Sequence, residues 1–104
     1  MHYLLFYDVV DGYVERRRPW RAAHLDYAQP YAARGELLLG GALDQPVDGA
    51  VLLFQADAPD LVEDFARSDP YVRQGLVVRW RVRPWLTVAG ALADAPLAPG
   101  DLSA

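Results

Sequence analysis

Strand-like and helix-like segments succeed one another in a definite order along the first 88 residues. Aromatic and β-branched residues are concentrated in short runs that favour strands, and two other segments carry apolar residues at helical spacing. We expect strands at residues 2–10, 36–43, 50–56 and 76–88, and helices at residues 13–34 and 59–67. The order β-α-β-β-α-β predicts the α+β class and a ferredoxin-like arrangement.

This arrangement predicts an antiparallel sheet with strand order 4-1-3-2 and both helices on one face. The last strand alternates apolar side chains with Arg79, Arg81 and Arg83, which is typical of a half-exposed edge strand. The first three strands have apolar side chains on both faces. Because one sheet face has no helix over it, a monomer would expose a large apolar patch. We therefore expect a homodimer that packs through the open sheet face, as in a dimeric α+β barrel.

Prolines and glycines predict where the first helix begins, bends and ends. Pro19 fits a first helical turn, and Gly35 fits the position that follows a helix. Pro30 removes the backbone hydrogen bond to the carbonyl of Asp26. We therefore expect one helix over residues 13–34 with a bend or break at 26–30.

Composition and charge exclude several classes of protein. The 104 residues fit one domain, which we place at residues 1–88, followed by an Ala/Pro/Gly-rich tail at 89–104 with no fold of its own. The absence of cysteine excludes disulfides and thiolate chemistry. The net charge of −4 is unlike that of a nucleic-acid binder. No apolar run has the length of a membrane span and no signal peptide is evident, so we expect a cytoplasmic protein.

The predicted topology gathers polar side chains at one end of the sheet. These side chains are Asp8, Asp11, Arg16, Arg17, Arg18, Asp48 and Asp69. His24 lies little more than one turn into the first helix and is within reach of this end. A histidine paired with a carboxylate can act as a general acid or base, although an inert, hydrogen-bonded histidine gives the same pattern. Asp69 precedes Pro70, which is also the pattern of a helix N-cap.

A basic cluster lies near the start of the first helix and consists of Arg16, Arg17, Arg18 and Arg21. Cations are unfavourable at that end of a helix dipole, so nearby acids or an anionic ligand must offset them. A solvated surface is one interpretation, and attraction of a carboxylate- or phenolate-bearing small molecule is the other. We predict catalytic roles for His24 and Asp69, and substrate binding by Arg18, Tyr71 and Tyr7. Tyr71 could equally be a hydrophobic plug. We expect no metal site and no cofactor.

Several short motifs occur together, in order, along residues 1–88. They are the aromatic segment Tyr3–Tyr7, the helical Ala23-His24-Leu25-x-Tyr27, Gly35-x-Leu37-Leu38 with Gly40-Gly41, Asp69-Pro70-Tyr71, and Val82-Arg83-Pro84-Trp85. Through these motifs the chain resembles the YciI-like (YCII-related) family. It departs from the family pattern at Ala42, where a proline is usual after the glycines, and at Pro30 in the first helix.

The resemblance implies a small ferredoxin-like dimer whose site is built around a histidine and an aspartate, here His24 and Asp69. It also implies proton-transfer or elimination chemistry on small cyclic compounds. Two functions stay open from the sequence. One is an isomerase- or lyase-type acid–base catalyst acting on a small anionic or cyclic metabolite. The other is a non-catalytic dimer that binds a small molecule or a partner through the same pocket.

Overall fold

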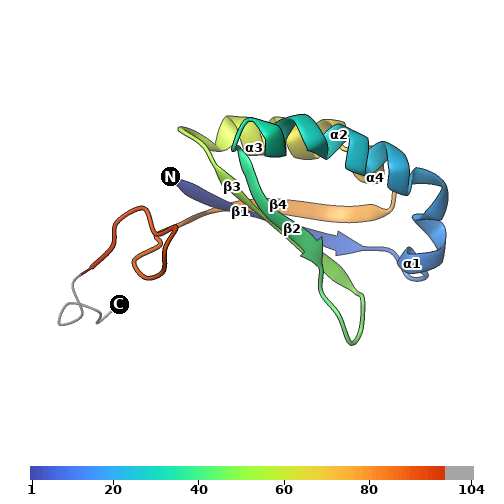
Figure 1. Ribbon diagram of the computed structural model, residues 1–104. Helices are drawn as coiled ribbons and strands as arrows, with labels where there is room; N and C mark the ends of the chain where they lie inside the picture. Colours follow the sequence, from blue (N-terminus) through green and yellow to red (C-terminus); the bar gives the residue numbers. More distant parts are fainter. Residues whose placement is uncertain (98–104) are drawn as a thin grey trace.

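A four-stranded sheet with helices on one face forms the body of the protein (Figure 1). The computed structural model describes residues 1–97. Its elements are β1 (His2–Val9), α1 (Tyr13–Arg16), the 3₁₀ helix η1 (Arg18–Trp20), α2 (Arg21–Ala33), β2 (Leu37–Ala42), β3 (Gly49–Gln55), α3 (Pro59–Ser68), α4 (Pro70–Arg73) and β4 (Val77–Trp85). Across the described residues, no helix combines the length and apolar character that crossing a membrane requires.

The sheet confirms the predicted ferredoxin-like topology. Its strand order is β2-β3-β1-β4, and every neighbouring pair is antiparallel. Tyr7 of β1 is paired with Ala50 of β3 on one side and with Trp80 of β4 on the other. The two strands predicted to be central are central, and β4 lies at an edge. Pro84 is accommodated there because an edge strand does not need every backbone N–H for the sheet.

The predicted single helix over residues 13–34 is wrong, because the segment is divided into α1, η1 and α2. Pro19 has no N–H to donate to a carbonyl one turn earlier, so a short 3₁₀ turn forms there instead of a continuous helix. The break expected at 26–30 does not occur, since α2 continues through Pro30 to Ala33. Gly35 ends this helix as expected: its φ of 76° lets the Glu36 N–H donate to the Tyr31 carbonyl at 2.9 Å.

The two long helices cover the sheet unequally. Helix α3 buries Val62, Phe65 and Ala66 on the sheet, where Phe65 meets Phe54 of β3 at 5.0 Å between ring centroids. Helix α2 has no fully buried residue. The core therefore lies under α3, and the part of the sheet under α2 is packed more loosely.

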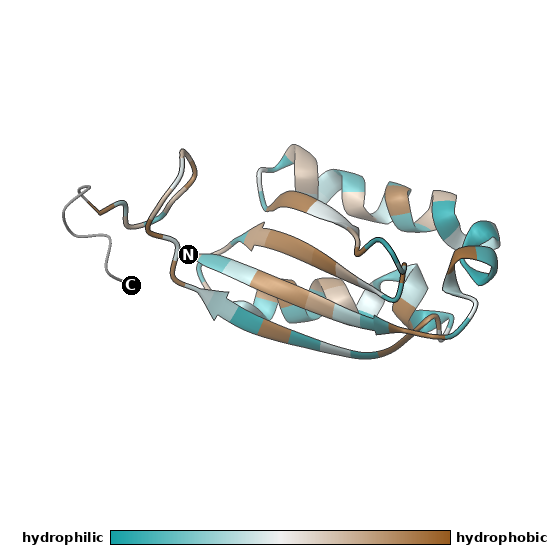
Figure 2. Ribbon diagram, turned by 90° about the horizontal axis from the view of Figure 1, so that it is seen from below, coloured by the Kyte–Doolittle hydropathy of each residue, from teal (hydrophilic) through white to brown (hydrophobic). Residues whose placement is uncertain are grey.

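The opposite sheet face is open (Figure 2). Its centre is apolar, with Leu4, Phe6, Val51 and Leu53 only partly buried on the two central strands. The arginines of β4 line its edge, since Arg79, Arg81 and Arg83 pair in register with Asp8, Phe6 and Leu4 of β1. The Arg79 guanidinium bonds the Asp8 carboxylate at 2.8 Å, and the Arg81 guanidinium lies 4.5 Å from the centre of the Phe6 ring.

After β4 the chain forms a small hook that lies beside the start of β1 (Figure 1). Backbone hydrogen bonds of 3.1 Å join Ala95 to Thr87 and Leu97 to Val88. The buried His2 holds the hook, with its Nδ1 2.6 Å from Thr87 Oγ1 and 3.3 Å from Asp94 Oδ2. Part of the segment that we expected to be a tail without its own fold therefore carries local structure. Residues 98–104 lie outside the described residues.

Candidate functional site

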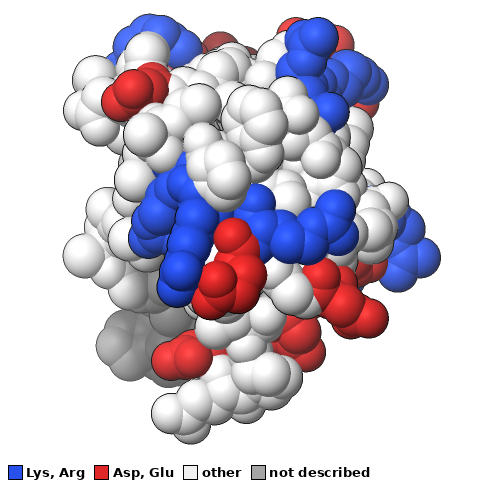
Figure 3. Space-filling model, turned by 90° about the vertical axis from the view of Figure 1, so that its right-hand side faces the viewer, with Lys and Arg blue, Asp and Glu red and all other residues white. Residues whose placement is uncertain are grey.

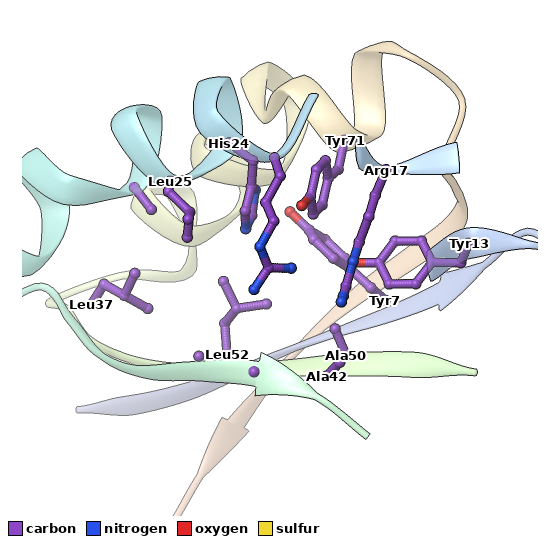
Figure 4. Close-up of a pocket in the computed structure, with 14 residues that line it drawn as sticks. Tyr7, Tyr13, Arg17, His24, Leu25, Leu37, Ala42, Ala50, Leu52 and Tyr71 are labelled. Carbon is purple, nitrogen blue, oxygen red and sulfur yellow. The ribbon is translucent and has the colours of Figure 1, made fainter. Parts of the chain in front are cut away.

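A cavity of about 280 Å³ lies between α2 and the sheet. It exists because α2 packs loosely there and because the sheet beneath it offers small side chains, among them Gly40, Ala42 and Ala50. Leu25 and Ala28 of α2, Leu37 of β2 and Leu52 of β3 add apolar walls. Polar groups enter from one end, near α1 and α4 (Figure 4).

Asp69 is the buried centre of the polar end. Its side chain is fully buried between α3 and α4, and it accepts hydrogen bonds from three donors. The Tyr71 N–H donates to Oδ1 at 3.0 Å, which confirms the predicted N-cap. The Tyr7 hydroxyl donates to Oδ2 at 2.7 Å, and His24 Nδ1 lies 2.7 Å from Oδ1. Three donors therefore satisfy the hydrogen-bonding capacity of this buried carboxylate.

His24 connects this carboxylate to the cavity. A carboxylate oxygen accepts hydrogen bonds, so Nδ1 of His24 is the donor in this bond, and Nε2 is the ring nitrogen left for a ligand. The imidazole stacks on the Tyr71 ring with 3.9 Å between centroids and 6° between planes. It lines the cavity and its side chain keeps 16% exposure. The stack and the Asp69 bond together fix the ring orientation.

Tyr7 supports the pair from the sheet. It is 2% exposed, and its hydroxyl is committed to Asp69. Burial raises the pKa of Tyr7 far above its ordinary value, and the charge of Asp69 and the hydrogen bond to it act in the same direction. Tyr7 therefore stays protonated and keeps donating to the carboxylate.

Tyr13 and Tyr71 form the aromatic end of the cavity. Their rings meet edge to face with centroids 5.8 Å apart. Burial raises the pKa of Tyr71, while the positive charges of Arg21 and Arg17 lower it. The electrostatic effect of both arginines therefore reaches the group that stacks on His24.

Arginine side chains gather at the end of the molecule where α1 lies (Figure 3). Arg17 and Arg21 line the cavity. Arg18, the arginine predicted to bind substrate, bonds Glu15 at 3.1 Å and does not line it. Asp8 is engaged with Arg79 on the open face and is likewise not among the lining residues.

The structure thus brings together four of the five predicted site residues, namely His24, Asp69, Tyr7 and Tyr71. Sequence reasoning missed the position of Tyr13, because residues 13–16 form a separate short helix that turns its ring inward. It also missed that Gly40 lines the cavity on its sheet side. The Gly40-Gly41 pair in the sequence could have indicated this position. In the described part of the chain, no three His, Cys, Asp or Glu side chains gather in a way that could hold a metal ion.

The fold and this pocket define a ferredoxin-like α+β domain with a histidine–aspartate site. A family model of the YCII-related domain matches residues 1–86, and the chain belongs to this family. No curated protein matches the chain significantly. Among solved structures, it is similar to 5-chloro-2-hydroxyhydroquinone dehydrochlorinase from Burkholderia phenoliruptrix AC1100, in complex with 2,5-dihydroxybenzoquinone. The identity is 27% and the TM-score 0.72, over 84% of this chain and 95% of that one.

Proposed function

We propose that the cavity is the active site of a small-molecule enzyme with isomerase- or lyase-type acid–base chemistry. The observation that carries the proposal is the 2.7 Å bond between His24 Nδ1 and the buried Asp69, on a histidine that lines the cavity. A pair of this kind leaves Nε2 as a base toward a bound substrate. The similarity to a dehydrochlorinase, which is a lyase, supports the same reaction class.

In the proposed reaction, Nε2 of His24 takes a proton from the substrate. The imidazolium that forms is stabilised by Asp69, which the hydroxyl of Tyr7 and the N–H of Tyr71 hold in place. In an isomerisation, the proton returns to another atom of the substrate. In an elimination, the electron pair left on the substrate expels an anion such as chloride, and His24 releases its proton to solvent.

A turnover screen of single-ring phenols and hydroxyquinones tests the proposal. The first compound is 5-chloro-2-hydroxyhydroquinone, the substrate in the name of the similar enzyme, with chloride release as the measurement. We expect His24→Gln to reduce kcat by roughly 10²- to 10⁴-fold, and Asp69→Asn to reduce it as well. His2→Gln is the matched control, because His2 lies outside the cavity. Equal turnover by wild type and His24→Gln would contradict the proposal.

We further propose that two copies of the chain associate through the open sheet face. The partly buried residues at its centre, Leu4, Phe6, Val51 and Leu53, have no helix over them. A group of apolar side chains on an uncovered sheet face is typical of an interaction site.

A further inference from the structure

Two guanidinium groups face the cavity without a carboxylate beside them. Arg17 follows α1 as its C-cap and Arg21 begins α2, with η1 between them, and both line the cavity. Within residues 1–97, neither forms an ion pair, and the Arg17 guanidinium lies 5.1 Å from the Tyr13 ring. Figure 4 shows Arg17 descending between Tyr71 and Tyr13 toward the sheet.

Two other arginines of the same cluster, Arg16 and Arg18, do not line the cavity. Arg18 is bonded to Glu15, so its charge is offset locally. Within the described part of the chain, the lining residues include no Asp or Glu, and the carboxylate that contacts His24, Asp69, is fully buried and already accepts three hydrogen bonds. The positive charge of Arg17 and Arg21 is therefore directed at the cavity, and two like charges held there favour an anion between them.

The positions of these arginines bring such an anion to the proposed catalytic pair. Arg21 and His24 are three residues apart on α2 and so lie on one side of the helix. The electrostatic effect of both arginines reaches Tyr71, whose ring stacks on His24 at 3.9 Å. An oxygen anion bound by the guanidiniums would therefore lie beside the imidazole.

The rest of the cavity limits what can carry the charge. Its volume of about 280 Å³ is at the small end for ligand sites, which suits a single ring. Leu25, Leu37 and Leu52 supply apolar contact, and the hydroxyls of Tyr13 and Tyr71 have no protein partner within the described residues. Both hydroxyls can bond ring oxygens of a ligand.

We infer that Arg17 and Arg21 form an oxyanion clamp, and that the ligand is a single-ring compound with two ring oxygens that are ionised when it binds or become ionised in the reaction. This inference rests on the proposed function for the location of the site. Two uncompensated cations match two negative charges, and planar guanidiniums suit oxyanions of a ring or its carboxylates. Such a ligand would place its ring over the small floor of Gly40 and Ala50 with one edge toward His24.

The test is equilibrium binding of 2,5-dihydroxybenzoquinone by isothermal titration calorimetry at neutral pH, where this acidic hydroxyquinone is ionised. We expect Arg17→Gln and Arg21→Gln each to weaken binding about tenfold or more, with a further loss in the double variant. Arg18→Gln is the matched control from the same cluster and should change binding less than twofold. Hydroquinone, a neutral ring with two oxygens, should bind at least tenfold more weakly to wild type.

Circular dichroism and thermal melting verify folding, and Arg17→Lys and Arg21→Lys provide second variants that retain the charge. The inference is overturned if wild type does not bind the hydroxyquinone, if Arg18→Gln loses as much affinity as the other two, or if hydroquinone binds equally well. If the arginine variants lose affinity but turnover does not depend on His24, the proposed function is refuted and the clamp is supported. Turnover that depends on His24, with binding indifferent to both arginines, would refute the clamp alone.

Discussion

At the scale of single residues, one buried carboxylate determines the geometry of the site. Asp69 caps α4, orients His24 and accepts from Tyr7, so one oxygen, Oδ1, serves both the cap and the histidine. The sequence predicted the cap and the histidine bond from the Asp-Pro-Tyr tripeptide and the topology. It also predicted substrate binding for Tyr7, which lines the cavity and whose hydroxyl bonds the second oxygen, Oδ2. Which oxygen receives which donor depends on side-chain placement that no local pattern encodes.

We predict that Tyr7→Phe destabilises the fold at neutral pH. The variant keeps the ring and leaves Oδ2 of the buried Asp69 without its donor, which costs about 1–3 kcal/mol of the free energy of unfolding. Urea denaturation monitored by circular dichroism measures this. Tyr3→Phe is the control, because the Tyr3 hydroxyl contacts only the sulfur of Met1 at 3.8 Å. A loss of equal size in both variants would contradict the role of Tyr7.

The same variant has a characteristic pH dependence. The pKa of Tyr7 is raised in the folded state, so above about pH 10 the unfolded chain releases a proton that the folded chain keeps. The free energy of unfolding of wild type therefore falls above pH 10, by up to about 1.4 kcal/mol per pH unit for this group. Tyr7→Phe has no tyrosine hydroxyl at this position and lacks this contribution. The difference in free energy of unfolding between wild type and Tyr7→Phe should therefore become smaller between pH 10 and 11. If the free energies of unfolding of wild type and Tyr7→Phe change in parallel with pH, Tyr7 does not make this contribution.

At the scale of secondary structure, the site exists because two helices pack differently. Helix α3 places Val62, Phe65 and Ala66 in the core, as its apolar spacing predicted. The sequence also predicted the strands to within a few residues, since alternation and turn residues bound them. It did not predict that α2 buries no residue, because the amount of space beneath a helix depends on the sheet residues opposite it.

Substitution of Gly40 on β2 by alanine would add one methyl group to the space between the sheet and α2. A Cβ there would lie 3.3 Å from Leu52 Cγ, and both residues line the cavity. We expect Gly40→Ala to displace the Leu52 side chain into the cavity and weaken binding of 2,5-dihydroxybenzoquinone roughly tenfold. A Cβ on the adjacent Gly41 would meet no atom within 4 Å, so Gly41→Ala should lose less affinity. Calorimetric titration of both variants with the hydroxyquinone measures the two affinities. An equal loss of affinity in Gly40→Ala and Gly41→Ala would contradict the proposed displacement of Leu52.

At the scale of the whole molecule, the order of elements was enough to predict the topology, the open face and the edge position of β4. Long-range contacts that lie outside the repeating patterns were not predictable. The bond of His2 to Thr87 joins residues at opposite ends of the sequence, and it holds the hook in place. The open face has one feature that was predictable and one that was not. Its apolar centre follows from the alternation of side chains along the strands. The cation–π contact of Arg81 with Phe6 depends on the register between β1 and β4.

The proposed homodimer gives a prediction at this scale. Leu39 lies on the open face beside Leu53 and is 67% exposed in the single chain, so charging it should leave the protomer fold intact. Size-exclusion chromatography with light scattering at micromolar concentration should give wild type twice the mass of one chain. Leu39→Glu should have the mass of one chain, because burying a carboxylate without a partner opposes association. Val14→Glu, at an exposed position on α1, should remain dimeric. A monomeric wild type, or a dimeric Leu39→Glu, would mean that the open face is not the interface.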